Sequence, residues 1–346
     1  MPFSFAQLAH PIVLAPLAGG PATASLAAAV SEAGGLGFLA AGYRSAEAVR
    51  EEIAELRDLT ARPFGVNLFA PGPARGDGAA LASYASTLAG EVQRYGVELG
   101  EPRHDDDRWD EKLALVAAER IAVVSVTFGC PSRSELDELH AAGCALWVTV
   151  TTAAEAVTAH DAGADALVVQ GVEAGGHRGS FDEEAPGEIG LLALLQLVRA
   201  VSDLPLVATG GIATGRGVAA VLAAGAAAAQ LGTAFMLAPE AATSPAHREA
   251  LVERGHTALT RAFTGRTARG IENRFMREHE PDAPNGYPEV HYLTAPVRSA
   301  ARERGDADGF HVWAGQAHTL AAELPAGELV RRLGEDARAA LRAAQF

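Results

Sequence analysis

Among the residues whose types could do chemistry, His177 is distinguished by its position. It lies in QGVEAGGHRG, residues 170–179, a stretch that begins at the end of an apolar run. Two glycines directly precede the histidine. A histidine side chain has an ordinary pKa of about 6.5, so it can accept or donate a proton near neutral pH. We therefore expect His177 to hold an anion or to act as a general base. Glu173 either orients the ring or faces solvent.

Two glycine-rich turns predict a phosphate-binding site. TGGIATG places Gly210 and Gly211 after one apolar run, and QLGT places Gly232 and Thr233 after the next. Glycine permits positive φ and lets backbone N–H groups approach a ligand closely. In barrels of alternating strands and helices, the last two such turns frequently bind phosphate against a helix N-terminus. The alternative is that each glycine only forms a tight turn.

Two amide side chains, Asn67 and Gln170, stand at the ends of otherwise apolar runs. An amide both donates and accepts hydrogen bonds, which suits the mixed N–H and C=O edge of a heterocycle. A phosphate on one side and amides in the middle predict flavin mononucleotide, FMN, lying across the site. Taken alone, each amide could instead only cap its strand.

The elements that must position these residues follow a repeat. Short apolar runs rich in β-branched residues alternate with amphipathic or alanine-rich segments, a pattern typical of parallel strands covered by helices. The pattern predicts an α/β fold, a (β/α)8 or TIM barrel, with the ligand at the carboxyl ends of the strands. An open doubly wound sheet is the alternative. We expect strands near 11–17, 36–40, 64–69, 123–128, 145–150, 166–171, 205–210 and 227–232, and helices over 22–33, 45–57, 132–142, 153–162, 190–201 and 214–224.

Two regions do not follow this repeat. Residues 70–122 hold more chain than one strand–helix unit needs, so we expect extra helices inserted after the third strand. Residues 240–320 are richer in polar and aromatic residues, and they predict a C-terminal helical lobe over the barrel mouth. The predicted division is a barrel over 1–240, to which the final helix within 326–346 returns, and a substrate-side lobe over 241–325.

Several stretches taken together resemble one known family. The resemblance covers residues 11 to 316, nearly the whole chain, and it is carried by PIVLAPLAGGPATASLAAAV, PFGVNLFAP, VSVTFGCPS, QGVEAGGHRGSF, ATGGIATGRG, QLGTAFMLAPEA, FTGRTARGIENRF, YPEVHYLTAPVR and VWAGQ. This set is similar to the nitronate monooxygenases, formerly called 2-nitropropane dioxygenases, which are FMN-dependent barrels. The resemblance implies oxidation of an alkyl nitronate, such as propionate 3-nitronate, with O2 to a carbonyl compound and nitrite.

The resemblance also implies roles for single residues. His177 would be the active-site histidine, which holds the nitronate or takes the α-proton of the neutral nitroalkane. Thr127 stands where some relatives have a second histidine, so substrate preference does not carry over at this substrate-side position. The implied FMN contacts are Asn67, Gln170, Gly175, Gly211, Gln230, Leu231, Gly232 and Thr233.

The predicted lobe holds further candidates. Arg266 and Arg269 pair either with a phosphate or with acidic side chains. Trp313 either stacks over the flavin or packs under the lobe, and we favour packing. The residues that either line the substrate side or serve the structure of the lobe are Tyr287, His291 and Tyr292.

Composition excludes several classes of function. The net charge of −15 argues against nucleic acid or an anionic membrane as a partner, and no apolar run is long enough to span a membrane. Lys112, the only lysine, lies in a polar segment, which argues against Schiff-base chemistry. Cys130 and Cys144 cannot form a disulfide framework, and we expect Cys130 to be inert. We expect a cytoplasmic monomer or homodimer without a metal site.

Three rival functions remain at this stage. An FMN-dependent enoyl-thioester reductase, such as an enoyl-ACP reductase, shares a similar glycine–histidine loop and would need room for NAD(P)H and an acyl carrier. A phosphate-binding lyase or isomerase would have no flavin. A ligand-binding barrel without catalysis would leave His177 without a role.

Overall fold

Eight parallel strands form the centre of the molecule. The computed structural model describes residues 3–74, 77–253 and 255–344. Each strand falls on one of the predicted apolar runs, and most of their side chains are buried. The strands are β1 (Ile12–Leu14), β2 (Gly37–Ala40), β3 (Phe64–Phe69), β4 (Val123–Thr127), β5 (Ala145–Val150), β6 (Ala166–Gln170), β8 (Leu206–Thr209) and β9 (Ala228–Leu231).

The sheet closes on itself to form a barrel. Its strand order is β1-β9-β8-β6-β5-β4-β3-β2, and all neighbours are parallel. A bridge between Val13 and Leu36 joins the two ends, where Leu14 N donates to Leu36 O at 2.9 Å and Leu36 N donates to Ile12 O at 3.0 Å. The predicted (β/α)8 barrel is therefore confirmed, and an open doubly wound sheet is excluded.

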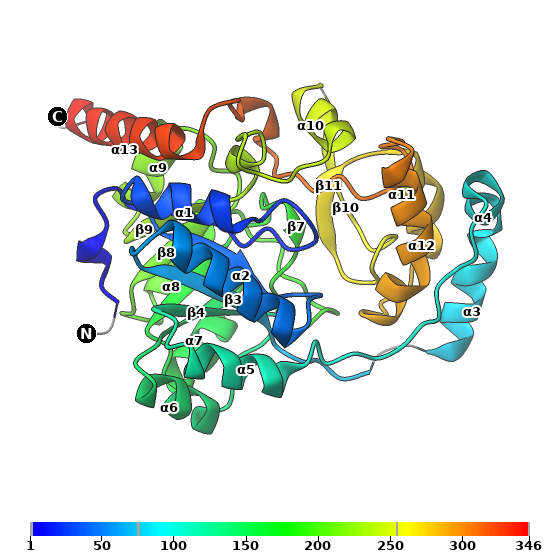
Figure 1. Cartoon of the computed structure of the whole chain (residues 1–346), viewed down its shortest axis with the longest axis horizontal. Coiled ribbons are helices and arrows are strands. Elements are labelled where there is room, and N and C mark those ends of the chain that lie inside the picture. Colours follow the sequence, from blue (N-terminus) through cyan, green and yellow to red (C-terminus); the bar gives the residue numbers. More distant parts are fainter. Residues whose placement is uncertain (1–2, 75–76, 254, 345–346) are drawn as a thin grey trace.

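Helices connect successive strands, as predicted, and local signals fix their ends. Ser132 and Thr152 form capping boxes at the starts of α6 and α7, and Gly163 ends α7 with φ of 106°. The last helix returns to pack on α9 and α1 (Figure 1). The barrel helices are α1 (Ala24–Glu32), α2 (Ala46–Leu59), α5 (Trp109–Ala118), α6 (Arg133–Ala141), α7 (Ala153–Ala162), α8 (Leu191–Arg199), α9 (Gly215–Ala223) and α13 (Ala326–Ala343).

The two ends of the barrel differ in chemistry. Side chains near the starts of the strands form an apolar cluster that includes Phe38 and Trp147. The N-terminal segment covers this cluster, with Phe5 stacked on Trp147 at 5.1 Å and Phe3 against its edge at 5.7 Å. Phe3 and Phe5 are only partly buried, so each contributes less than the roughly 2 kcal/mol of a fully buried aromatic side chain. The described residues thus cover the amino ends of the strands, and the carboxyl ends are open to a ligand.

A second group of elements covers the open end. It contains α10 (Pro245–Val252), α11 (Arg274–His279) and α12 (Glu289–Glu303). The sequence predicted helices alone here, but the lobe also holds the antiparallel strands β10 (Thr257–Thr260) and β11 (Ala268–Ile271). Figure 1 shows these strands between the barrel and the helices α11 and α12.

The extra helices after β3 belong in space to this lobe. They are α3 (Gly78–Thr87) and α4 (Ala89–Tyr95), and both contact α12 at the edge of the molecule opposite α13 (Figure 1). Leu81 and Tyr84 join Phe263 and Phe275 in one buried cluster. Part of the segment that the sequence assigned to the barrel thus completes the core of the lobe. The division into domains at residue 240 stays a prediction.

None of the helices within the described residues is long and apolar enough to cross a membrane.

Candidate active site

A cavity of about 560 Å³ lies between the carboxyl ends of the strands and the lobe. That volume falls within the usual range for small-molecule and cofactor sites. His177, Thr127 and His291 line it together with every residue predicted to bind the cofactor: Asn67, Gln170, Gly175, Gly210, Gly211, Gln230, Leu231, Gly232 and Thr233.

The predicted phosphate turn after β8 has backbone geometry that requires glycine, whereas Gly232 after β9 has a negative φ of −108°. Gly210 and Gly211 follow β8 with φ of 118° and 66°. A Cβ atom on Gly211 would lie 2.9 Å from Glu173 Cβ. Thr233 begins a short 3-10 helix after β9, and its Oγ1 accepts a hydrogen bond from Gly315 N at 3.0 Å. Both turns thus leave backbone close to the cavity with no side chain in the way, which suits a phosphate.

The three amide side chains in the cavity are not equivalent. The Asn67 Nδ2 group donates to Ser125 Oγ at 2.8 Å and to Thr127 Oγ1 at 3.0 Å. Thr127 therefore fixes Asn67. Gln230 is only 4% exposed, and none of the described residues hydrogen-bonds its amide. A buried amide without a partner is costly, so Gln230 is a well-placed contact for a ligand.

The side-chain amide of Gln170 is engaged in hydrogen bonds within the protein and is not free to contact a ligand. Its Nε2 donates to His177 O at 3.1 Å, and its Oε1 accepts from Arg178 Nη1 at 2.9 Å and from Gly179 N at 2.8 Å. Arg178 is 1% exposed and also donates to Gly171 O at 2.7 Å. Sequence reasoning missed Arg178, which ties the segment carrying His177 back to the end of β6.

His177 lies on a short strand and not on a free loop. Gly176 and His177 form β7, which pairs antiparallel with β11, so that His177 faces Ala268 and Gly176 faces Arg269. Glycines of the kind that precede His177 indicate a flexible loop when the sequence is read alone. This interpretation was wrong because the pairing partner lies in the lobe, about ninety residues further along the chain.

A single hydrogen bond orients the His177 ring. Its Nε2 lies 2.9 Å from Thr264 Oγ1, and the Thr264 hydroxyl donates to Arg266 O at 3.3 Å. We assign the hydroxyl proton to that carbonyl, so that the Thr264 oxygen accepts from His177 Nε2–H. The neutral ring then carries its lone pair on Nδ1. Glu173 has no part in this, because its carboxylate accepts from Leu191 N at the start of α8.

Burial keeps His177 neutral. Loss of solvent lowers its pKa to about 3, and the positive charges of Arg266 and Arg298 act in the same direction. The cationic form expected as one possibility from the sequence is thus disfavoured. A neutral histidine with an available Nδ1 is suited to accept a proton.

Aromatic side chains surround the ring. Phe128, Tyr287 and Trp313 have ring centroids 5.9, 5.9 and 5.4 Å from that of His177. Trp313 packs edge-on against Phe263 in the lobe, as favoured from the sequence, and it also lines the cavity.

The lobe candidates occupy different places. His291 lines the cavity, stacked on Tyr43 with 4.4 Å between centroids. Tyr287 lies behind His177 beside a smaller cavity of about 40 Å³, and its hydroxyl donates to Tyr43 Oη at 3.2 Å. Tyr292 is outside both cavities, where its hydroxyl donates to Asp105 at 2.6 Å. Tyr292 therefore cannot contact a ligand in either one.

The arginines considered from the sequence do not line the main cavity. Arg266 forms a buried ion pair with Glu183 and lies 3.9 Å from the centroid of Phe128. Arg269 donates to Val172 O at 2.8 Å. Two other arginines, Arg298 and Arg302 on α12, do line it. One feature of the sequence could have indicated that Arg298 is buried near the cavity: it stands on the apolar face of an amphipathic helix.

Two reactive residues have no catalytic setting. Lys112 is buried, contrary to the exposed position that its polar segment indicated, and its Nζ lies 2.7 Å from Asp107 Oδ2. It is outside the main cavity, so it cannot form a Schiff base there. Burial raises the pKa of Cys130 to about 11, which agrees with an inert thiol.

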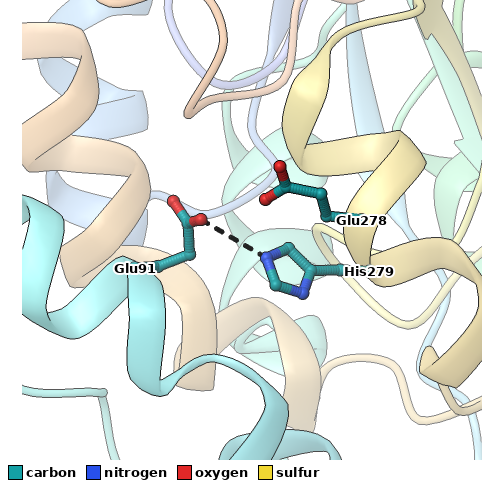
Figure 2. Close-up of side chains that lie close together, drawn as sticks. All are labelled: Glu91, Glu278 and His279. Carbon is teal, nitrogen blue, oxygen red and sulfur yellow. Dashed lines mark hydrogen bonds and ion pairs between the residues drawn. The ribbon is translucent and has the colours of Figure 1, made fainter.

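One group of side chains in the described part of the chain has the donor types of a metal site. Figure 2 shows Glu91, from α4, facing Glu278 and His279, from α11. The Arg274 guanidinium already bonds both carboxylates, with 2.8 Å between Nη2 and Glu91 Oε2 and 2.7 Å between Nη1 and Glu278 Oε2. The arginine supplies the positive charge there, so we assign this group a structural role.

Comparisons with known proteins agree with the geometry. Residues 4–336 match the family model described as nitronate monooxygenase. A nitronate monooxygenase of Pseudomonas aeruginosa is 43% identical, over 95% of this chain and 96% of that protein. The chain belongs to the nitronate monooxygenase family. This family is flavin-dependent, and the protein is an oxidoreductase.

Further members and neighbours support the same assignment. A nitronate monooxygenase of Paraburkholderia phytofirmans is 40% identical, over 93% of this chain and 91% of that protein. The crystal structure of a nitroalkane oxidase from Streptomyces ansochromogenes superposes with a TM-score of 0.95 at 51% identity, with 98% of each chain covered. These relatives indicate that the protein oxidises nitronates or nitroalkanes.

Two further solved structures are less similar to this chain. FabK from Thermotoga maritima superposes with a TM-score of 0.77 at 27% identity, over 98% of this chain and 96% of that one. An enoyl reductase domain from Bacillus amyloliquefaciens is 13% identical with a TM-score of 0.68, which shows the shared fold alone.

Proposed function

We propose that this nitronate monooxygenase family member uses FMN and O2 to oxidise alkyl nitronates, such as propionate 3-nitronate, to a carbonyl compound and nitrite. The observation that carries the proposal is the neutral His177, with its Nε2 engaged by Thr264, at the wall of the cavity. The family supplies the reaction class, and His177 would supply the base that converts a neutral nitroalkane into the nitronate.

The residues of the cavity fit an FMN. The turns at Gly210–Gly211 and Gly232–Thr233 would receive the phosphate, and the unpartnered Gln230 amide would meet the polar edge of the ring. Bound there, the flavin would supply electron transfer from the substrate to O2. Gln170 contributes indirectly, because it holds the backbone of His177.

His177 would act through Nδ1. When the neutral nitroalkane enters, Nδ1 takes the α-proton, and the electron pair of the broken C–H bond remains on the nitronate. The resulting Nδ1–H then faces an anion, so the charge that burial disfavours on the ring is balanced. Phe128 and Trp313 would exclude water from this exchange.

The test is direct. The purified protein should show a visible flavin spectrum and release nitrite while consuming O2 when propionate 3-nitronate is added. His177→Asn should lower kcat/KM for the neutral nitroalkane by about 100-fold or more, because general-base catalysis contributes at least that much. Full activity of the variant would refute the role of His177.

Two further outcomes would refute the function itself. A colourless protein that does not take up FMN would favour a lyase or isomerase. Rapid NAD(P)H oxidation with an enoyl thioester, without nitrite from any nitronate, would favour the reductase.

A further inference from the structure

Two cations face the main cavity from α12 without a counter-charge. Arg298 and Arg302 lie one helical turn apart; the first is 6% exposed and the second is half-buried. Among the described residues, no carboxylate forms an ion pair with either guanidinium. Burial lowers the pKa of Arg298 only to about 10, so it stays charged at neutral pH. A buried charge without a partner is costly, which indicates a missing anion.

The hydrogen bonds that Arg298 and Arg302 make within the protein do not use all of their N–H donors. Arg298 donates to Thr294 Oγ1 at 2.9 Å and to His291 O at 2.6 Å. Its Nη1 lies 3.3 Å from His311 Nδ1, while Arg302 Nη2 lies 3.1 Å from His311 Nε2. A neutral imidazole has one lone pair for accepting, so only one of the two guanidinium groups can donate to His311.

Protonation of His311 cannot resolve this excess of donors. Burial and the two nearby arginines hold the pKa of His311 well below its ordinary value. A protonated ring would also lose its one acceptor. An anionic ligand with two oxygen acceptors would satisfy the unmatched N–H groups and balance the charge.

The position of the group separates it from the turns that suit a phosphate. Those turns follow β8 and β9 of the barrel, whereas the arginines lie on the lobe helix α12. His177 is near enough for Arg298 to lower its pKa, and Trp313 contacts both His177 and His311, at 5.4 and 4.9 Å between centroids. An anionic group held here would therefore place the rest of a small substrate toward His177.

We propose that Arg298, Arg302 and His311 form a subsite for a carboxylate on the tail of the substrate. This proposal rests on the proposed function, because the subsite would favour those nitronate substrates that carry a second anionic group. A nitronate with a purely alkyl tail would leave the arginines unpaired and would be used less well.

The first experiment measures binding without turnover. Succinate is titrated calorimetrically into the flavin-loaded protein and into two variants, Arg302→Gln and Arg332→Gln. Arg302 is chosen because it is half-buried, and Arg332 is an exposed arginine on α13 that serves as a charge-matched control. We expect the Arg302 variant to bind succinate about tenfold more weakly and the control to match the unmodified protein. Equal affinity in all three proteins would overturn the subsite.

The second experiment compares two substrates. The ratio of kcat/KM for propionate 3-nitronate to that for ethylnitronate should fall about tenfold in Arg302→Gln. An equal loss on both substrates would place the arginine on the nitronate group and overturn the proposal. Loss of bound FMN from a variant with unchanged thermal stability would place it on the cofactor phosphate and overturn it too. If the unmodified protein oxidises neither nitronate, the proposed function fails, while the succinate titration still decides the subsite.

Discussion

At the scale of single residues, the proposed role of His177 as a base would depend on a threonine from another part of the chain. Thr264 accepts the Nε2–H bond at 2.9 Å and is itself held by the Arg266 backbone. Without that acceptor, the neutral ring could carry its proton on either nitrogen. The threonine thus selects the tautomer that leaves Nδ1 free.

Replacement of this threonine tests the assignment. Thr264→Val keeps the shape but removes the acceptor, so we expect kcat for a neutral nitroalkane to fall about tenfold while flavin content is unchanged. Steady-state nitrite release measures the effect. Thr264→Ser restores the hydroxyl and should recover most of the activity. A valine variant with full activity would show that the ring is oriented by something else.

The residue scale also separates what sequence could predict from what it could not. The positions of His177, the turn glycines and Gln230 at the cavity were predictable because each lies at or shortly after the carboxyl end of an apolar barrel strand, where the ligand site of such a barrel is found. Thr264 and Arg298 were missed because they meet the site through long-range packing. Gln170 was placed correctly in the cavity, but its amide contacts depend on Arg178 and Gly179, which no local pattern reveals.

At the scale of elements, the turn after β8 joins a strand to a helix and also presents backbone to the cavity. Gly211→Ala adds a Cβ at φ of 66° and 2.9 Å from Glu173 Cβ. We expect the flavin-to-protein absorbance ratio of the purified variant to fall severalfold, because the turn must shift. Gly225→Ala is the matched control, since its φ is 95° but its Cβ would meet nothing within 4 Å. If both variants lose flavin equally, general backbone strain is the cause.

The contact between α4 and α11 is a second element-scale feature. Arg274 bonds both Glu91 and Glu278, and the bonds from Arg274 and His279 hold the pKa of Glu91 at about 2 although burial opposes this (Figure 2). Arg274→Met should lower the free energy of unfolding by about 3 kcal/mol, because it leaves the buried Glu91 without its main partner. Denaturant melts measure this. Arg277→Met, on the exposed face of α11, should change stability by less than about 1 kcal/mol.

Elements differed in how readily the sequence predicted them. The barrel strands were clear because both of their faces are buried, which makes the apolar runs nearly continuous. Thr257–Thr260 escaped notice because most of that strand is only partly buried and its partner β11 is equally short. The third strand of this small sheet is β7, which pairs with β11 and is only two residues long.

At the scale of the whole molecule, buried neutral histidines make stability depend on pH. Burial lowers the pKa of His177 to about 3, helped by Arg266 and Arg298, and that of His247 to about 4, helped by Arg302. The unfolded chain binds these protons near pH 6.5, so it takes up more protons than the folded state below that pH. Stability is therefore full above about pH 6.5 and decreases as the pH falls toward the folded pKa values.

Urea midpoints of the ligand-free protein at pH 7.5 and 5.5 measure this dependence. Each such histidine contributes at most about 1.4 kcal/mol per pH unit in this window, while Glu91 titrates well below it. His247→Gln keeps a donor for Trp313 O, so it should reduce the pH slope without abolishing folding. A slope that is the same in the variant would contradict the assignment.

The pairing of β7 with β11 constrains how substrates enter and products leave. His177 is part of the barrel chain by covalent connection and part of the lobe sheet by hydrogen bonds. A hinge motion that lifted the lobe would have to separate these strands and pull the histidine from its place with every turnover. We therefore expect substrates and products to pass along the edge of α12, where the exposed Ser299 borders the cavity. The barrel and the lobe would stay paired through β7 and β11 during this exchange.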